Sequence, residues 1–266
     1  MTLAYERVGD GPPLVLLHGV GHRRQAWDAV AGPLRDQREL IMVDLPGHGE
    51  SPPLELNGRE PVQAMAEDVI AFLDELGLDQ PHVAGNSLGG ALALIIGSEG
   101  RAATVTGLSP AGFWVNRRQY QYAKVIFKIM ETTGAAIQGS AGRLSRSTAG
   151  RAVMFASVVS HPSRLSPEQA AADARAFLTA RPAIDAILAT PLWFTAPIPE
   201  RVPVTIAWGS KDRMLLPSQA TVAQRQLPAA RFRSLPGCGH VPMTDDPTLV
   251  AEVLLAGSSL PATAER

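Results

Sequence analysis

A serine between two glycines is the feature of this sequence that could most directly do chemistry. Residues 85–90 read Gly-Asn-Ser-Leu-Gly-Gly, so Ser87 is the centre of a G-x-S-x-G pattern. A short apolar run at 82–84 precedes the pattern, and an apolar helical stretch at 91–96 follows it. Between a strand and a helix, this pattern is typical of a nucleophile elbow, and the helix N-terminus favours the negative charge that develops there. The alternative interpretation is a glycine-rich turn that carries an ordinary serine.

Histidine and cysteine residues offer weaker alternatives for chemistry. His18 and His22 are spaced like zinc ligands, but they lie beside glycines in a predicted loop and lack the glutamate of an H-E-x-x-H motif. Cys238 is the only cysteine, which excludes a disulfide within the chain and a cysteine-based zinc cluster. We therefore expect no metal site and no cofactor. We expect His18 to order its loop and His48 to hydrogen-bond within its own turn.

The residues around Ser87 lie in a repeated alternation of strand and helix patterns. Short apolar runs bounded by glycine and proline predict strands that are buried on both faces. Amphipathic or wholly apolar stretches between them predict helices, such as residues 62–76, which end at Gly77. This alternation predicts an α/β fold with a mostly parallel central sheet and helices on both of its faces. The predicted strands lie at residues 14–17, 40–43, 82–84, 103–108 and 204–208, with a weaker one at 231–235.

The alternation stops between residues 113 and 195, where helical patterns predominate. This stretch holds ten Lys or Arg and four Asp or Glu, a balance of +6, whereas the rest of the chain holds 14 and 21, a balance of −7. We interpret residues 1–112 and 196–266 as a core domain and residues 113–195 as a helical cap inserted into it. The large aromatic side chains of the cap are candidates for the wall of an acyl pocket, and equally for the cap's own core. These candidates are Trp114, Phe127, Phe155, Trp193 and Phe194.

Composition limits the classes of function. Of the 266 residues, 45% are apolar and 18% are charged, so the chain can form a large core. The formal net charge of −1 argues against a general nucleic-acid-binding protein, because that class is usually strongly basic. No run approaches the roughly 18 apolar residues of a membrane span, and Glu6, Arg7 and Asp10 interrupt any apolar signal segment. We therefore expect a cytoplasmic protein with a small-molecule partner.

Five motifs, in the same order along the chain, resemble those of the α/β-hydrolase family. The resemblance covers residues 3–112 and 196–257. The elbow at Ser87 is one of the five. His-Gly-Val-Gly at 18–21 is similar to the family's oxyanion loop, and Asp-Leu-Pro-Gly-His-Gly-Glu-Ser at 44–51 is similar to its loop after the next strand. Trp-Gly-Ser-Lys-Asp at 208–212 is similar to the strand that ends in the triad acid, and Gly-Cys-Gly-His at 237–240 is similar to the loop of the triad histidine.

This resemblance implies a catalytic triad in the chain order Ser87, Asp212, His240. Ser87 is then the nucleophile and His240 takes its proton. Asp212 orients the imidazole and stabilises the imidazolium. The implied donors to the oxyanion are the backbone N–H groups of Val20 and Leu88.

Two other acidic residues near the histidine are candidates for the triad acid. Asp245 and Asp246 lie closer to His240 in sequence than Asp212 does. Asp246, however, has a sufficient role as the N-cap of a predicted helix that begins at Pro247. Some family members carry the acid after an earlier strand, but residues 108–112 contain no acid here. We therefore prefer Asp212.

Several features depart from the family pattern. The chain begins at what resembles the family's second strand, so we expect the antiparallel first strand to be absent. Asn86 resembles the subgroup that hydrolyses carbon–carbon bonds in ring-cleavage products. However, Val-Pro-Met at 241–243 stands where that subgroup has Trp after the histidine, and Gly-His-Arg at 21–23 stands where it favours Gly-Pro-Gly. Ser87 in place of aspartate argues against haloalkane dehalogenase or epoxide hydrolase activity.

The resemblance thus implies a serine hydrolase that cleaves a small to medium carboxylic ester or lactone through an acyl-enzyme. Two alternatives stay open. One is hydrolysis of a carbon–carbon bond in a vinylogous diketone acid, and the other is a ligand sensor that keeps the fold without turnover. The expected partner is the ester or lactone substrate itself, with neither nucleic acid nor a membrane span.

Overall fold

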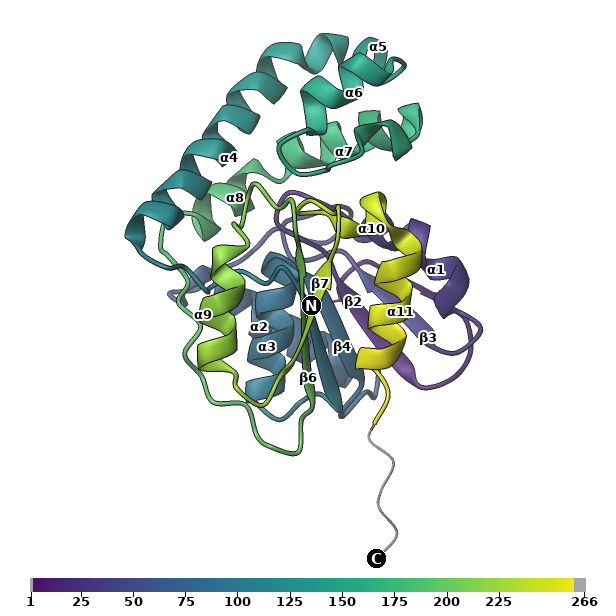
Figure 1. Ribbon diagram of the computed structural model, residues 1–266, viewed down its shortest axis with the longest axis vertical. Coiled ribbons are helices and arrows are strands. Elements are labelled where there is room, and N and C mark those ends of the chain that lie inside the picture. The colour runs from purple at the N-terminus through teal and green to yellow at the C-terminus, as the bar shows by residue number, and fades with distance from the viewer. Residues whose placement is uncertain (1, 261–266) are drawn as a thin grey trace, which may run out of the picture.

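A seven-stranded sheet forms the centre of the computed structural model, which describes residues 2–260 (Figure 1). The strands follow the order β1-β3-β2-β4-β5-β6-β7, and every neighbouring pair except β1 and β3 is parallel. The predicted mostly parallel sheet is therefore confirmed. Residues 1 and 261–266, the ends of the predicted core domain, lie outside the described part of the chain. The strands are β1 (Tyr5–Val8), β2 (Pro13–Leu17), β3 (Glu39–Val43), β4 (His82–Asn86), β5 (Thr104–Leu108), β6 (Val204–Gly209) and β7 (Arg231–Leu235).

The antiparallel strand that we expected to be absent is present as β1, so that expectation is wrong. Tyr5 pairs with Val43, and Val8 pairs with Leu40, in antiparallel register. β1 lies at the edge of the sheet, and three of its four residues are exposed. A four-residue strand with two charged side chains contains no apolar run, so the pattern that predicts buried strands cannot detect it.

Helices cover both faces of the sheet, as predicted (Figure 1). On one face, α2, α3 and α9 share a core with alternate strand side chains such as Val15 and Ile41. On the other face, α1 and α11 pack against the intervening side chains, such as Leu16 and Met42. Successive side chains of a strand point to opposite faces, which is why these strands are apolar throughout. The core helices are η1 (Arg24–Trp27), α1 (Asp28–Leu34), α2 (Pro61–Glu75), α3 (Leu88–Ser98), α9 (Ser218–Gln226), α10 (Pro242–Asp245) and α11 (Pro247–Gly257).

The helical insertion predicted after β5 is also present. Its helices occupy residues 117–187 and form a separate layer above the sheet in Figure 1. Asn116 caps the first of them by accepting hydrogen bonds from the backbone N–H groups of Arg118 and Gln119. No helix within residues 2–260 is both long enough and apolar enough to cross a membrane. The insertion consists of α4 (Arg117–Ile137), η2 (Gln138–Ser140), α5 (Ala141–Leu144), α6 (Thr148–Phe155), η3 (Pro162–Arg164), α7 (Pro167–Thr179) and α8 (Arg181–Ile187).

Candidate active site

Ser87 lies in a sharp turn between β4 and α3, in the middle of the sheet. Its backbone has φ 56° and ψ −115°, a conformation that costs a residue with a side chain free energy. A Cβ atom on Gly85 would collide with the carbonyl oxygen of Gly89, and one on Gly89 would collide with that of Leu17. Only glycine therefore fits on either side of the turn. The result is a serine held at the N-terminus of an apolar, buried helix.

Asp212 lies in the loop after β6, and His240 lies in the loop after β7. The two side chains meet at this end of the sheet. His240 Nδ1 is 2.8 Å from Asp212 Oδ2, and both side chains are buried. The other carboxylate oxygen, Oδ1, accepts hydrogen bonds from the backbone N–H groups of Met214 at 2.9 Å and Leu215 at 2.8 Å. Three partners thus fix the carboxylate. Because it engages Nδ1 of His240, Nε2 is the ring nitrogen that can exchange a proton with a reacting group.

Ser87 and His240 line one cavity of about 270 Å³. Residues from the loop after β2, from the elbow and from the inserted helices complete its wall. The structure therefore brings the sequence-predicted Ser87, Asp212 and His240 into one place, although Ser87 and His240 are 153 positions apart in the chain. The arrangement can support proton transfer from a hydroxyl to an imidazole that a carboxylate orients.

The two backbone N–H groups predicted as oxyanion donors also lie beside Ser87. Leu88 is the first residue of α3, and Val20 lies in the loop after β2 and lines the cavity. Neither N–H has a hydrogen-bond acceptor among the described residues. Gly19 lets this loop approach, because a Cβ atom there would lie 3.3 Å from Ser87 Cβ. Free donors at a helix N-terminus and in an adjacent loop are suited to a developing anion.

His18 holds the loop that contains Val20. Its Nδ1 lies 2.8 Å from the carbonyl oxygen of Gly19, and its Nε2 accepts a hydrogen bond of 3.0 Å from the backbone N–H of Leu45. These partners require the neutral tautomer with the proton on Nδ1. Burial lowers the pKa of His18 well below its ordinary value, and the neighbouring His48 lowers it further. Both ring nitrogens are therefore engaged by the backbone, which leaves no nitrogen of His18 for a metal.

Asp44 fixes the same loop from its other end. Its Oδ1 accepts a hydrogen bond of 2.6 Å from the backbone N–H of Arg24, and its Oδ2 accepts one of 3.0 Å from that of Glu50. The guanidinium of Arg24 pairs with Asp44 as well. A Cβ atom on Gly49 would collide with the Asp44 carboxylate, so this loop needs glycine there. The loop after β2 is consequently tied to the loop after β3.

The two alternative triad acids have other partners. Asp246 Oδ1 caps α11 by accepting from the backbone N–H of Leu249 at 3.1 Å, as predicted. The buried Asp245 carboxylate accepts from the backbone N–H groups of Gly239 at 2.7 Å, Ser160 at 3.0 Å and His161 at 2.6 Å. Asp245 therefore connects the histidine loop to the inserted segment, whereas the described carboxylate that hydrogen-bonds the His240 ring is that of Asp212.

Asn86, the residue before the nucleophile, has a backbone role. Its amide Nδ2 donates to the carbonyl oxygens of Leu108 at 3.0 Å and His240 at 2.9 Å. It thereby holds the elbow against the histidine loop. Cys238 is buried, and burial, with the nearby Asp245 and Asp246 carboxylates, raises the pKa of its thiol to about 11. Cys238 is thus a poor thiolate nucleophile.

The aromatic residues proposed for the acyl pocket separate into two groups. Phe127 and Phe155 line the cavity, whereas Trp114, Trp193 and Phe194 are not among its lining residues. Trp114 is buried at the base of the insertion, where its Nε1 donates to the carbonyl oxygen of Leu192 at 2.8 Å. Phe194 is buried against Phe113, and Trp193 is 40% exposed. Trp193 and Phe194 lie in the segment between α8 and β6, which has no helix or strand, so sequence periodicity could not place them.

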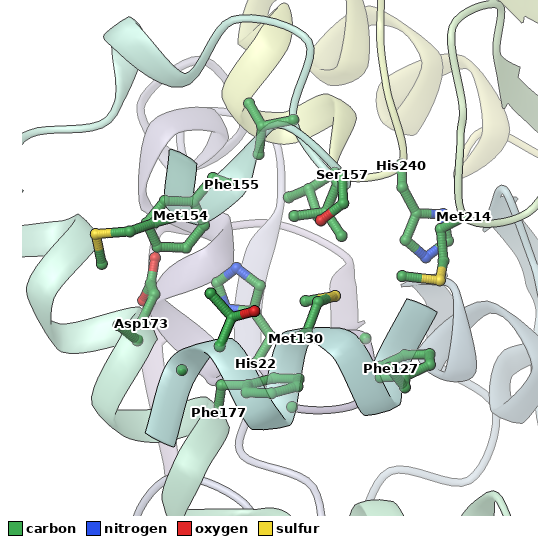
Figure 2. Close-up of a pocket in the computed structure, with 18 of the residues that line it drawn as sticks. His22, Phe127, Met130, Met154, Phe155, Ser157, Asp173, Phe177, Met214 and His240 are labelled. Carbon is green, nitrogen blue, oxygen red and sulfur yellow. The ribbon is translucent and has the colours of Figure 1, made fainter. Parts of the chain in front are cut away.

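Several cavity residues were not singled out from the sequence. Figure 2 shows His240, Met214 and Phe127 toward one end of the cavity, and Met154 and Asp173 toward the other. Phe177 lies between them and packs on the loop after β2, because a Cβ atom on Gly21 would lie 2.5 Å from its ring. Helical amphipathicity could have marked Met130, Met154 and Phe177 as inward-facing, but it could not tell cavity wall from cap core. Met214 lies in the loop between β6 and α9, where no helical pattern could mark it. Those missed include Met130, Met154, Phe177 and Met214.

The sequence profile of the alpha/beta hydrolase family matches residues 14–253. The chain belongs to the α/β hydrolase family. The match includes the elbow, the inserted helices and the loops of Asp212 and His240, so the expected family is confirmed.

Relatives of this α/β hydrolase match mainly over shorter segments. Over 116 residues, 42% of this chain and 30% of the relative, it is 40% identical to the dihydrolipoyllysine-residue acetyltransferase component of the acetoin cleaving system of Cupriavidus necator. Over 93 residues, 35% of each chain, it is 41% identical to the pimeloyl-[acyl-carrier protein] methyl ester esterase of Aeromonas hydrophila. The matched part thus spans about a third of the length of these curated relatives.

Solved structures resemble this α/β hydrolase along nearly its whole length. A bacterial membrane phospholipase A superimposes with a TM-score of 0.75 at 22% identity, over 97% of this chain and 85% of that one. A thermophilic esterase from Thermogutta terrifontis superimposes with a TM-score of 0.69 at 20% identity, over 96% and 92%. At these identities the likeness shows the shared fold.

Proposed function

We propose that this α/β hydrolase is a serine hydrolase that cleaves a carboxylic ester or lactone through an acyl-enzyme. The observation that carries the proposal is the 2.8 Å contact between His240 Nδ1 and Asp212 Oδ2, beside the cavity that Ser87 lines. A buried imidazole oriented by a carboxylate is the general base that a serine hydroxyl needs, since serine is a weak nucleophile at its own pKa.

The proposed reaction has two halves. Ser87 Oγ attacks the carbonyl carbon while its proton moves to His240 Nε2, and Asp212 stabilises the resulting imidazolium. The negative oxygen of the tetrahedral intermediate accepts hydrogen bonds from the N–H groups of Val20 and Leu88. His240 then gives its proton to the leaving alkoxide, and the carbon–oxygen bond of the ester breaks. Water repeats the sequence on the acyl-enzyme and releases the carboxylic acid.

Three observations support an ester or lactone as the substrate class. Donors fixed in the backbone, such as Leu88 N–H at the start of α3, are typically worth about 3–4 kcal/mol to an acyl-transfer transition state. Solved proteins with the same fold include a thermophilic esterase and an enzyme that degrades N-acyl homoserine lactones. The relative from Aeromonas hydrophila is named a methyl ester esterase.

The test is covalent labelling of the intact protein with a fluorophosphonate, followed by peptide mapping. We expect a single adduct on Ser87, and we expect hydrolysis of p-nitrophenyl butyrate that Ser87→Ala abolishes. A protein that only senses a ligand would bind the ester without hydrolysing it. Labelling at another residue, or full esterase activity in Ser87→Ala, would overturn the proposal.

A further inference from the structure

The cavity at Ser87 continues far beyond the reacting groups, along the inner face of α4. Lining residues on this helix run from Ile126 to Ile137. At 1.5 Å per residue, these eleven steps cover about 16 Å. Figure 2 shows the helix crossing the view beneath the cavity, from Phe127 near His240 toward the end marked by Met154. The hollow is therefore an elongated cleft that starts at the catalytic residues.

The walls of this cleft are mostly apolar and adaptable, with a few polar side chains such as Thr133, Gln138 and Arg175 among them. Met130 faces it from α4, Met154 and Phe155 from α6, and Phe177 from α7. Methionine side chains fill irregular apolar space and adjust to a flexible ligand. The acidic wall residue, Asp173, is ion-paired with Arg23 Nε at 3.0 Å, so its charge is compensated. Such a wall fits a flexible hydrocarbon better than a polar or aromatic group.

Two large apolar side chains at the rim are left in water. Ile129 on α4 is 55% exposed and Val153 on α6 is 69% exposed, and both line the cleft. Exposed apolar residues are ordinary when they are scattered singly, but these two border the same apolar hollow. A hydrocarbon lying in the cleft would contact both of them and remove apolar area from water.

We propose that this cleft binds a linear, saturated acyl chain of about eight to twelve carbons. At about 1.3 Å per carbon, from C–C bonds of about 1.5 Å at tetrahedral angles, a length of about 16 Å holds about twelve carbons. The acyl chain stays attached to Ser87 between the two halves of the reaction, whereas the alcohol must leave and water must enter. The apolar cleft therefore suits the acyl part of the ester rather than its alcohol part. This inference rests on the proposed function and names its substrate class.

A chain-length series of p-nitrophenyl esters, kept below their micelle concentrations, tests the proposal. We expect kcat/KM to rise from butyrate to decanoate by about a hundredfold or more, since each buried methylene is worth about fourfold in binding. Gly134 lines the cleft on α4, and a Cβ atom there would lie 3.3 Å from Leu178 of α7. Gly134→Leu should therefore obstruct the cleft and lower the decanoate-to-butyrate ratio by about tenfold or more.

The matched control is Ala135→Leu, one residue along the same helix. Ala135 is exposed and does not line the cavity, so this variant should keep the wild-type ratio. Leucine has a higher helix propensity than glycine, so Gly134→Leu is expected to fold. A flat chain-length profile, or an unchanged ratio in Gly134→Leu, overturns the proposal. Faster hydrolysis of decyl acetate than of methyl decanoate overturns it as well, because the chain would then belong to the alcohol.

A binding measurement separates this inference from the proposed function. Calorimetric titration of Ser87→Ala with sodium decanoate should show binding that Gly134→Leu weakens by about tenfold or more and Ala135→Leu retains. If no ester is hydrolysed but decanoate binds in this way, the chain site stands and the hydrolase proposal fails. If short esters are hydrolysed through Ser87 but decanoate does not bind, the hydrolase proposal stands and the chain site fails.

Discussion

The backbone N–H of His240 donates a hydrogen bond of 2.8 Å to the carbonyl oxygen of Val158, which lies in the insertion. The same carbonyl accepts a second bond, of 3.0 Å, from the N–H of Val241. Asp245 adds a bridge, since its carboxylate binds the N–H groups of both Gly239 and Ser160. The insertion therefore does more than cover the cavity. Its loop between α6 and η3 helps to set the position of the histidine proposed as the general base.

Replacing Asp245 with Asn should destabilise the protein by about 2–3 kcal/mol. Its Oδ1 accepts from His161 N–H, and its Oδ2 accepts from Gly239 and Ser160 N–H. An amide keeps one accepting oxygen and turns an N–H₂ donor toward backbone donors, which leaves buried groups unsatisfied. Urea unfolding followed by circular dichroism measures the loss.

The neighbouring variant Asp246→Asn is the matched control. The side chain of Asp246 accepts one hydrogen bond, from Leu249 N–H, and asparagine is an N-cap as good as aspartate. We expect its unfolding free energy to change by less than about 0.5 kcal/mol. Equal losses in the two variants would show that Asp245 has no special anchoring role.

Replacing Asp212 with Asn should remove activity with little loss of stability. The amide oxygen can still accept from Met214 and Leu215, as Oδ1 does now. The amide N–H₂, however, would face His240 Nδ1 and favour the wrong tautomer, a change that costs about 10⁴-fold in kcat in a comparable triad. Ester turnover and thermal unfolding of the same preparation decide the matter. A variant with more than a tenth of wild-type kcat would exclude Asp212 as the orienting acid.

Replacing Ser87 with Gly should give a more stable protein than replacing it with Ala. Both variants lack the hydroxyl, but alanine retains the strained φ of 56° and ψ of −115°, which typically costs about 1–3 kcal/mol. Glycine relieves that strain and loses about 0.5–1 kcal/mol through its freedom in the unfolded chain. We expect a net gain of about 1 kcal/mol for Ser87→Gly over Ser87→Ala, measured by denaturant unfolding. The same stability in both variants would mean that the turn is unstrained.

Stability should fall as the pH is lowered from about 6.5 to about 4, in part because of His18 and His48. Burial lowers the pKa of His48 from its ordinary 6.5 to about 4, and burial with the neighbouring His48 also lowers that of His18. In this window the unfolded chain binds protons that the folded protein excludes. The free energy of unfolding therefore decreases as the pH falls, by up to about 1.4 kcal/mol per pH unit for each histidine.

His48→Gln isolates one of these contributions. The ring of His48 is buried with Nε2 unpartnered, and glutamine at this position does not titrate. As the pH falls from 6.5 to 4.5, we expect the unfolding free energy of the wild type to decrease relative to that of His48→Gln, by about 1.4 kcal/mol per pH unit. Urea denaturation at four pH values measures the difference. Parallel curves would assign the acid sensitivity to other groups.

Much of the core fold could be predicted because its signals are local. Most of the parallel strands are short runs of buried residues, and several of them, such as β2 and β4, are followed by a helix that covers one face of the sheet. The elbow is also local, since Gly85 and Gly89 are required within one turn of Ser87. β1 was not predicted because an exposed edge strand can form through backbone hydrogen bonds to its neighbour without buried side chains. Its Glu6 and Arg7 therefore contribute no apolar signal.

The sequence by itself determined the order along the chain of the buried strands and the helices of the core, the glycine-bounded turn of Ser87 and the types of side chain available to it. Only the tertiary structure decided which acid meets His240. Asp245 is close in sequence but accepts from backbone groups, whereas Asp212 is brought to 2.8 Å by the packing of β6 beside β7. It also decided that Phe127 and Phe177 line the cleft while Trp114 and Phe194 do not. Inward and outward faces of a cap helix look alike in sequence, because burial against a neighbouring helix and burial around a cavity select the same apolar residues.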